Sequence, residues 1–138
     1  MKRLALSVIP VVVLALSSCS DGGTNLGALG RPVQVPYQDQ VTLPHEELTI
    51  FFTALDEDSR CPAPATCMSS GQATISIALS KPDAPVAPRA LTFGGAAGTN
   101  VVSYEQYTVT LVKLAPSPTV GQQRLPSDYV ATLVVSKL

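Results

Sequence analysis

The sequence predicts an all-β domain, an antiparallel sandwich-like fold or a partly open barrel of seven or eight short strands. Three features of the chain from Arg31 onward favour this class. Apolar and polar residues alternate with a period of two in several short runs. Turn residues, mainly proline and glycine, separate these runs. No long stretch has the 3.6-residue period of an amphipathic helix, and strands that follow one another without helices indicate two packed layers of sheet.

The first four predicted strands lie between residues 33 and 79. Short alternating runs at 33–35 and 40–43 each end at a proline. The run 48–55 is apolar on both faces, so we expect a strand inside a sheet with a neighbour on each side. The run 72–79 alternates most clearly. Its pattern predicts that Ala73, Ile75, Ile77 and Leu79 are buried, and that Gln72, Thr74 and Ser76 are largely exposed.

The remaining strands are separated by stronger turn signals. Residues 81–88 contain three prolines and must form a loop or an edge strand. A short strand at 90–93 is followed by the glycine-rich residues 94–98, which we expect to form a hairpin turn. The run 107–114 changes phase at Lys113, which predicts a β-bulge near Val112. Two prolines end that strand, and the run 129–137 forms the last one.

The first 18 residues have the features of a signal peptide. Lys2 and Arg3 precede thirteen uncharged, mostly apolar residues at 4–16. A membrane-spanning helix needs about 20 apolar residues, whereas a signal-peptide core is this short. Pro10 also interrupts the run. We therefore predict that residues 1–18 are removed.

The residues at the predicted cleavage site carry a more specific signal. Leu16-Ser17-Ser18-Cys19, directly after the apolar run, resembles the lipobox of bacterial lipoproteins. The resemblance implies that the Cys19 thiol receives a diacylglycerol and that the freed amine can receive a further chain such as palmitate. Two or more chains anchor a protein stably to a membrane. The alternative is a plain secreted protein in which Cys19 is incidental.

The predicted domain organisation follows from this cleavage. Residues 19–30 comprise the lipidated Cys19 and a flexible, glycine-rich tether, and residues 31–138 form the β domain. The resemblance places the protein in the bacterial cell envelope, on the periplasmic side of a membrane. In enteric-type bacteria an aspartate directly after the lipidated cysteine signals inner-membrane retention. Here Ser20 stands at that position, so the outer membrane is favoured over the inner one.

Charge narrows the class of partner. Removal of Lys2 and Arg3 with the signal peptide leaves seven basic against ten acidic residues, a formal charge of −3. Nucleic-acid binding favours clustered lysine and arginine, so we expect no nucleic-acid partner. The expected partners are membrane lipid, through acylated Cys19, and an envelope protein.

Cys61 and Cys67 remain as an even pair once Cys19 carries lipid. In an oxidising compartment such a pair predicts a disulfide. The closed ring would have seven residues, for which the loop-entropy relation gives roughly 2–2.5 kcal/mol. We therefore expect the bridge to hold a local loop more than the whole fold.

The region around these cysteines resembles a recurring pattern in small exported bacterial domains. An apolar strand runs into Glu57-Asp58-Ser59-Arg60-Cys61-Pro62, and a second cysteine, a glycine and an alternating strand follow. A later Tyr-x-Val-x-Leu strand, a Pro-x-Pro and a last Tyr-x-x-x-Leu strand complete the pattern. The resemblance spans about residues 33–137 and implies a shared β fold without an assigned activity. Met68-Ser69-Ser70 departs from the pattern, which usually has a tryptophan there.

Asp58 and Arg60 are expected to form a structural corner of this loop. Asp58 can accept hydrogen bonds from turn amides, and Arg60 can pair with Asp56 or Asp58. The alternative is a Ca²⁺ site made by the acidic residues 56–58. Successive strand residues point to opposite faces, which disfavours that alternative.

Catalytic chemistry has weak support in the sequence. His45 is the only histidine, beside Glu46 and Glu47, and we interpret it as a solvated turn residue. No serine has a nucleophile-elbow context. We predict no catalytic or metal site and no cofactor. The sequence favours a non-enzymatic binding or structural role in the envelope, and the alternative is a metal-handling or hydrolytic envelope enzyme.

Overall fold

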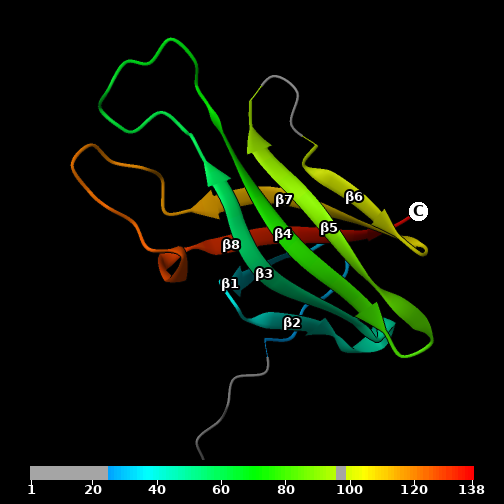
Figure 1. Ribbon diagram of the computed structural model, residues 1–138. Helices are drawn as coiled ribbons and strands as arrows, with labels where there is room; N and C mark the ends of the chain where they lie inside the picture. The colour runs from blue at the N-terminus through cyan, green and yellow to red at the C-terminus, as the bar shows by residue number, and fades with distance from the viewer. Residues whose placement is uncertain (1–24, 96–98) are drawn as a thin grey trace, which may run out of the picture.

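The computed structural model describes residues 25–95 and 99–138. These residues form eight strands in two four-stranded antiparallel sheets that pack face to face (Figure 1). One sheet has the order β1-β8-β7-β6 and the other β2-β3-β4-β5. The predicted all-β sandwich is therefore confirmed. The signal peptide, Cys19 and the tether up to Thr24 lie outside the described residues.

The strands follow the chain in this order: β1 (Pro32–Pro36), β2 (Gln40–Leu43), β3 (Leu48–Asp58), β4 (Gln72–Lys81), β5 (Ala84–Gly94), β6 (Val101–Tyr104), β7 (Tyr107–Ala115) and β8 (Val130–Lys137). Two short 3₁₀ turns, η1 (Pro44–Glu46) and η2 (Pro126–Asp128), precede β3 and β8. Among the described residues, no helix has the length and apolar character that crossing a membrane requires.

The hydrophobic core lies between the two sheets. Every strand except β6 contributes at least one fully buried apolar side chain, and β6 adds the nearly buried Tyr104. Phe52 of β3 and Tyr107 of β7 are among the largest buried side chains. Removal of these surfaces from water is the main driving force for bringing the sheets together.

Strand β4 has the register that its alternation predicts. Ala73, Ile75, Ile77 and Leu79 are all fully buried. The sequence predicted that their polar neighbours at 72, 74 and 76 are largely exposed, but in the structure these side chains are half-buried. The reason is that β4 lies between β3 and β5, so side chains of both neighbours cover part of its outer face.

Replacement of Ile75 by alanine should lower the free energy of unfolding by roughly 2–5 kcal/mol, because it leaves a void in a packed core. The adjacent Thr74→Ala should cost only about 1 kcal/mol, because it loses one outer-face hydrogen bond to Thr92. Urea unfolding of both variants measures the contrast. Equal losses would contradict the assigned register.

Several other strand predictions are confirmed. β3 lies inside its sheet, between β2 and β4. The register of β7 against β8 shifts between Leu111 and Lys113, which is the predicted bulge at Val112. The proline-rich segment 81–88 does form an edge, because β5 is the last strand of its sheet. Strand β5 is longer than predicted, since an edge strand tolerates prolines such as Pro88.

Two segments of the chain differ from the predictions. The segment that begins at Gly94 was expected to be a hairpin turn, but β5 and β6 belong to different sheets, so it joins the two layers. Its residues 96–98 lie outside the described residues. Residues 25–30, assigned to the tether, lie against the domain in the structure. Gly27 N–H donates to the Thr42 carbonyl, and Gly30 N–H donates to the Val135 carbonyl.

Candidate functional site

The polar corner predicted around Asp58 lies at the C-terminal end of β3. Asp58 pairs across the ladder with Ala73, whose side chain is fully buried, so the carboxylate faces the end of the sandwich interior. Two register irregularities, on either side of Ala54 and Leu55, precede it in β3. Such bulges commonly change the direction of a side chain near the end of a strand.

Arg60 binds this carboxylate with two parallel hydrogen bonds. Its Nε donates to Oδ1 of Asp58 and its Nη2 to Oδ2, each over 2.8 Å. The guanidinium also donates to the carbonyl oxygens of Leu114 and Pro116, at 2.8 and 2.9 Å. Only 9% of either charged side chain is exposed. Arg60 therefore joins the end of β3, in one sheet, to the end of β7, in the other.

Tyr129, just before β8, completes the corner. Its hydroxyl donates to Oδ2 of Asp58 over 2.7 Å. Burial by itself would raise the pKa of the Asp58 carboxyl, but hydrogen bonds from Arg60 and Tyr129 outweigh burial and hold that pKa below its usual value. Burial and the bond to Asp58 raise the pKa of the Tyr129 hydroxyl. The corner is thus an anionic carboxylate with charged and neutral donors around it.

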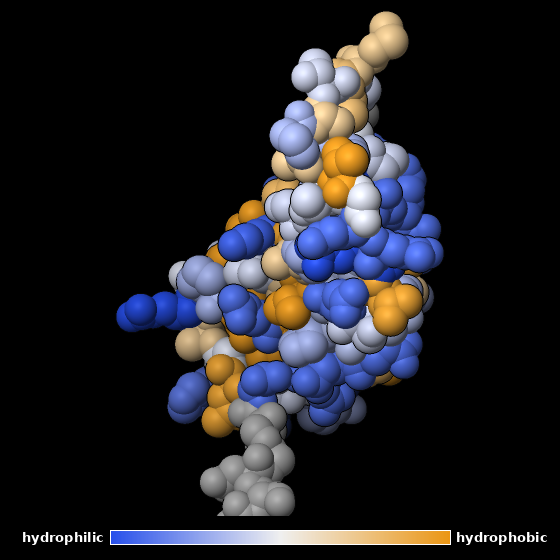
Figure 2. All heavy atoms as spheres, turned by 90° about the vertical axis from the view of Figure 1, so that its left-hand side faces the viewer, coloured by the Kyte–Doolittle hydropathy of each residue, from blue (hydrophilic) through white to orange (hydrophobic). Residues whose placement is uncertain are grey.

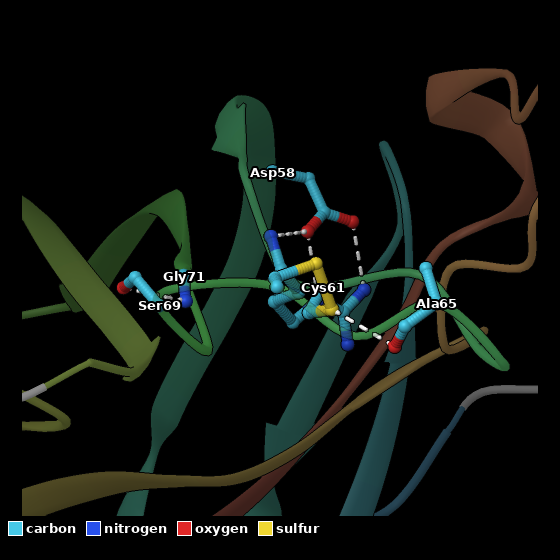
Figure 3. Close-up of a disulfide and its surroundings, with 7 residues drawn as sticks. Asp58, Cys61, Ala65, Ser69 and Gly71 are labelled. Carbon is cyan, nitrogen blue, oxygen red and sulfur yellow. Dashed lines mark hydrogen bonds and ion pairs between the residues drawn. A yellow bond between two sulfur atoms is a disulfide. The ribbon is translucent and has the colours of Figure 1, made fainter.

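The predicted disulfide follows directly after this corner (Figure 3). The Cα atoms of Cys61 and Cys67 are 5.9 Å apart, within the range that a disulfide requires. Cys61 N–H donates to the Ser70 carbonyl, and Ser59 N–H donates to the Gln72 carbonyl. These bonds close the base of the loop between β3 and β4.

A second loop, between β7 and β8, lies against the disulfide loop. Ala63 N–H donates to the Pro118 carbonyl over 3.1 Å, and Val120 N–H donates to the Ala63 carbonyl over 3.0 Å. The two segments, 59–71 and 116–128, are called the loop pair from here on. The parallel bridge between Ala63 and Thr119 makes them one continuous surface at one end of the sandwich.

The loop pair carries exposed apolar side chains. Met68 is fully exposed, and Val120 and Leu125 are 55% and 62% exposed. Figure 2 views the molecule from the side of the loop pair and shows apolar residues mixed with weakly polar ones at the upper end, above a band of hydrophilic residues. Loops held in place on a rigid scaffold are common positions for contact residues, so these three apolar side chains are candidates for that role.

A second polar cluster ties the opposite end of the sandwich. The buried Tyr107 donates its hydroxyl to Oε2 of Glu46 over 2.6 Å, and Nζ of Lys137 lies 2.9 Å from the same oxygen. Lys81 donates to the Glu46 carbonyl, and its Nζ lies 5.0 Å from the centre of the Tyr107 ring. Hydrogen bonds from Tyr107 and Lys137 lower the pKa of the Glu46 carboxyl.

The other residues considered from the sequence do not converge. His45 is exposed in η1. Asp56 accepts a hydrogen bond from the Ser76 hydroxyl, whereas Asp58 faces Arg60. In the part of the chain that the structure describes, no three side chains of the metal-ligating types come together. Cys19, the predicted lipid site, lies outside that part.

Comparison with known proteins adds nothing to this geometry: no protein-family model, curated protein or solved structure is significantly similar to the chain.

Sequence reasoning identified Asp58, Arg60 and both cysteines, but it missed their long-range partners. Tyr129 is 71 residues from Asp58, and the carbonyls bound by Arg60 are 54 and 56 residues away. The only available signal was that Tyr129 opens the last apolar strand. A tyrosine at the rim of a core usually places its hydroxyl on a buried polar partner.

Proposed function

We propose that this protein is a lipid-anchored, non-enzymatic component of the bacterial cell envelope that binds an envelope protein through the loop pair. The observation that carries the proposal is the loop pair itself. Two segments far apart in sequence are fixed to one another and to the sandwich, and they display Met68, Val120 and Leu125 to solvent.

Preorganisation of these loops supports a binding role. Binding with flexible loops loses conformational entropy, and loops already held in place lose less. Arg60 and the disulfide restrain the first segment, while Arg60 also holds Pro116 at the start of the second. The charged pair Asp58–Arg60 is internal to the corner, so the surface offered to a partner is formed mainly by uncharged residues, both apolar and polar.

The use of the polar groups supports binding over the alternative, a metal-handling or hydrolytic enzyme. The guanidinium of Arg60 contacts Asp58 and two main-chain carbonyls, and the Asp58 carboxylate accepts from Arg60 and Tyr129. These groups bind one another rather than converging on an open space. A catalytic site needs polar groups that converge on a substrate.

The lipid anchor rests on Leu16-Ser17-Ser18-Cys19, and the fold is compatible with it. The described chain begins next to β2, at the lower side of Figure 1, whereas the loop pair lies at the upper left. Six residue steps from Cys19 to Asn25 span at most about 20 Å. On this proposal the domain lies near the surface of a membrane, and the outer membrane is favoured over the inner one. The loop pair is then directed away from that membrane.

Cys19→Ala should abolish lipid attachment and leave uncleaved or mislocalised precursor, because the thiol is the acylation site. Intact-mass measurement of membrane-extracted protein, together with fractionation, checks this result. A mature wild-type protein with a free Cys19 thiol would overturn the anchor.

Photo-cross-linking in living cells tests the loop pair. A photoreactive amino acid in place of Met68 or Leu125 should give a discrete protein adduct. The matched control is Gln34, an exposed residue on β1 away from the loop pair. Adducts at Gln34 alone, or at none of the three positions, would contradict the proposal.

A further inference from the structure

A cleft of about 450 Å³ lies on the outer face of the β2–β5 sheet, remote from the loop pair. Its lining residues come from β2, η1, the start of β3 and the end of β4, which meet at the lower right of Figure 1. We call it the hydroxyl cleft and define it by Thr42, Pro44, Glu47, Thr49, Ser80 and Lys81.

The sheet face around the hydroxyl cleft has an unusual composition for a surface exposed to water. Outer faces of antiparallel sheets commonly carry charged side chains. Here the outward positions of β2, β4, β5 and the first half of β3 carry no charge. They are Gln40, Thr42, Thr49, Phe51, Gln72, Thr74, Ser76, Ala78, Ser80, Val86, Pro88, Ala90 and Thr92.

The hydroxyl groups in the cleft retain hydrogen-bonding capacity. Thr42 and Thr49 lie opposite each other on neighbouring strands, with 3.2 Å between their hydroxyl oxygens. Each hydroxyl has one donor and two acceptor positions, and the bond between them uses one proton. The pair therefore still offers one O–H donor and several lone pairs to a ligand.

Charged groups at the rim limit the type of ligand further. Lys81 lines the cleft, but its ammonium binds the Glu46 carbonyl and lies over the Tyr107 ring. The two ion pairs found among the described residues are Arg60–Asp58 and Lys137–Glu46, so neither contains Glu47. The exposed Glu47 carboxylate is left to accept hydrogen bonds and to repel anions.

Phe51 supplies an apolar contact next to the cleft. It lies two residues beyond Thr49 on the same face of β3, is half-buried, and has the small Ala78 opposite it. A sugar ring combines hydroxyl groups at its rim with an apolar face of C–H groups. Hydroxyls, a free carboxylate and a partly exposed aromatic ring match these two properties.

We propose that the hydroxyl cleft binds a neutral glycan chain. The volume of the cleft accommodates one or two sugar units. The inference goes beyond the protein contact proposed for the loop pair and does not depend on it.

Binding of defined oligosaccharides tests the proposal. The full mature protein, in a detergent without a sugar head group, is titrated with a neutral β-linked N-acetylglucosamine oligomer or with cellohexaose. Two-dimensional NMR at millimolar ligand should show shifts at Thr42, Thr49 and Ser80. The anionic polygalacturonate should bind more weakly, because Glu47 repels it.

The chain provides a matched control for the hydroxyl pair. Thr42→Val/Thr49→Val should weaken binding by about fivefold, since a hydrogen bond contributes about 1 kcal/mol. Thr74→Val/Thr92→Val removes a pair with the same 3.2 Å spacing on the same sheet but outside the cleft, and should leave affinity unchanged. No binding of neutral glycans, equal effects of both double variants, or preferred binding of polygalacturonate would overturn the proposal.

Discussion

Gly71→Ala should be among the most damaging single changes in the domain, with an expected loss of more than about 3 kcal/mol of unfolding free energy. Gly71 has φ +65°, a conformation that side chains disfavour. A Cβ atom built there would lie 1.8 Å from the Ser59 carbonyl oxygen and 2.5 Å from its carbon. Both are main-chain atoms, so no side-chain rotation relieves the clash.

The clash cannot be relieved by a small movement of Ser59 either. Ser59 N–H donates to the Gln72 carbonyl over 2.7 Å, and Ser59 opens the loop that Cys61 and Cys67 close. Movement of Ser59 would therefore disturb both the β3–β4 ladder and the loop pair. A side chain at position 71 is therefore excluded by the close approach of the Ser59 main chain.

Gly121→Ala provides the control for Gly71→Ala. Gly121 also has a positive φ, +78°, but no atom lies within 4 Å of a Cβ built on it. Gly121→Ala should therefore lower the free energy of unfolding only by the cost of the disfavoured backbone conformation, about 1–2 kcal/mol. Urea unfolding of both variants separates the clash from the backbone strain. Similar losses for the two variants would contradict the contact with Ser59.

Local features of the fold were predictable from the sequence because each depends on neighbouring residues. Alternation in β4 fixes which side chains face the core, and the phase change at Lys113 marks the bulge in β7. The prolines before Arg89 mark an edge strand. The six-residue separation of Cys61 and Cys67, together with the predicted export of the chain to an oxidising compartment, was enough to predict the disulfide.

Features that depend on how the two sheets pack could not be predicted in this way. The bond from Tyr129 to Asp58 and those from Arg60 to the end of β7 exist only because both sheets end at the same side of the sandwich. The Glu46–Tyr107–Lys137 cluster arises in the same way at the other end. Periodicity identifies strands, but it does not say which strand ends meet.

The Asp58–Arg60 pair should contribute strongly to stability. Arg60→Ala leaves the Asp58 carboxylate and the Leu114 carbonyl without their charged donor, inside a corner that is largely closed to water. Breaking a buried pair by removing one partner is strongly destabilising, and at the end of the sandwich we expect a loss of roughly 2–4 kcal/mol. Arg31→Ala, at an exposed site, should stay within about 0.5 kcal/mol.

The same pair should make stability depend on pH in the acid range. The pKa of Asp58 is lower in the folded than in the unfolded chain, so the folded state binds fewer protons. Its contribution is therefore fully present above the unfolded pKa of about 4 and decreases as pH falls through the folded value. Asp58→Asn should remove this part of the acid sensitivity. The part that remains is expected from Glu46, whose pKa is also lowered. Urea unfolding at neutral pH and near pH 3 measures this difference in stability. Two results would show that the corner does not stabilise the fold: an unchanged pH profile in Asp58→Asn, or a loss of unfolding free energy in Arg60→Ala no larger than in Arg31→Ala.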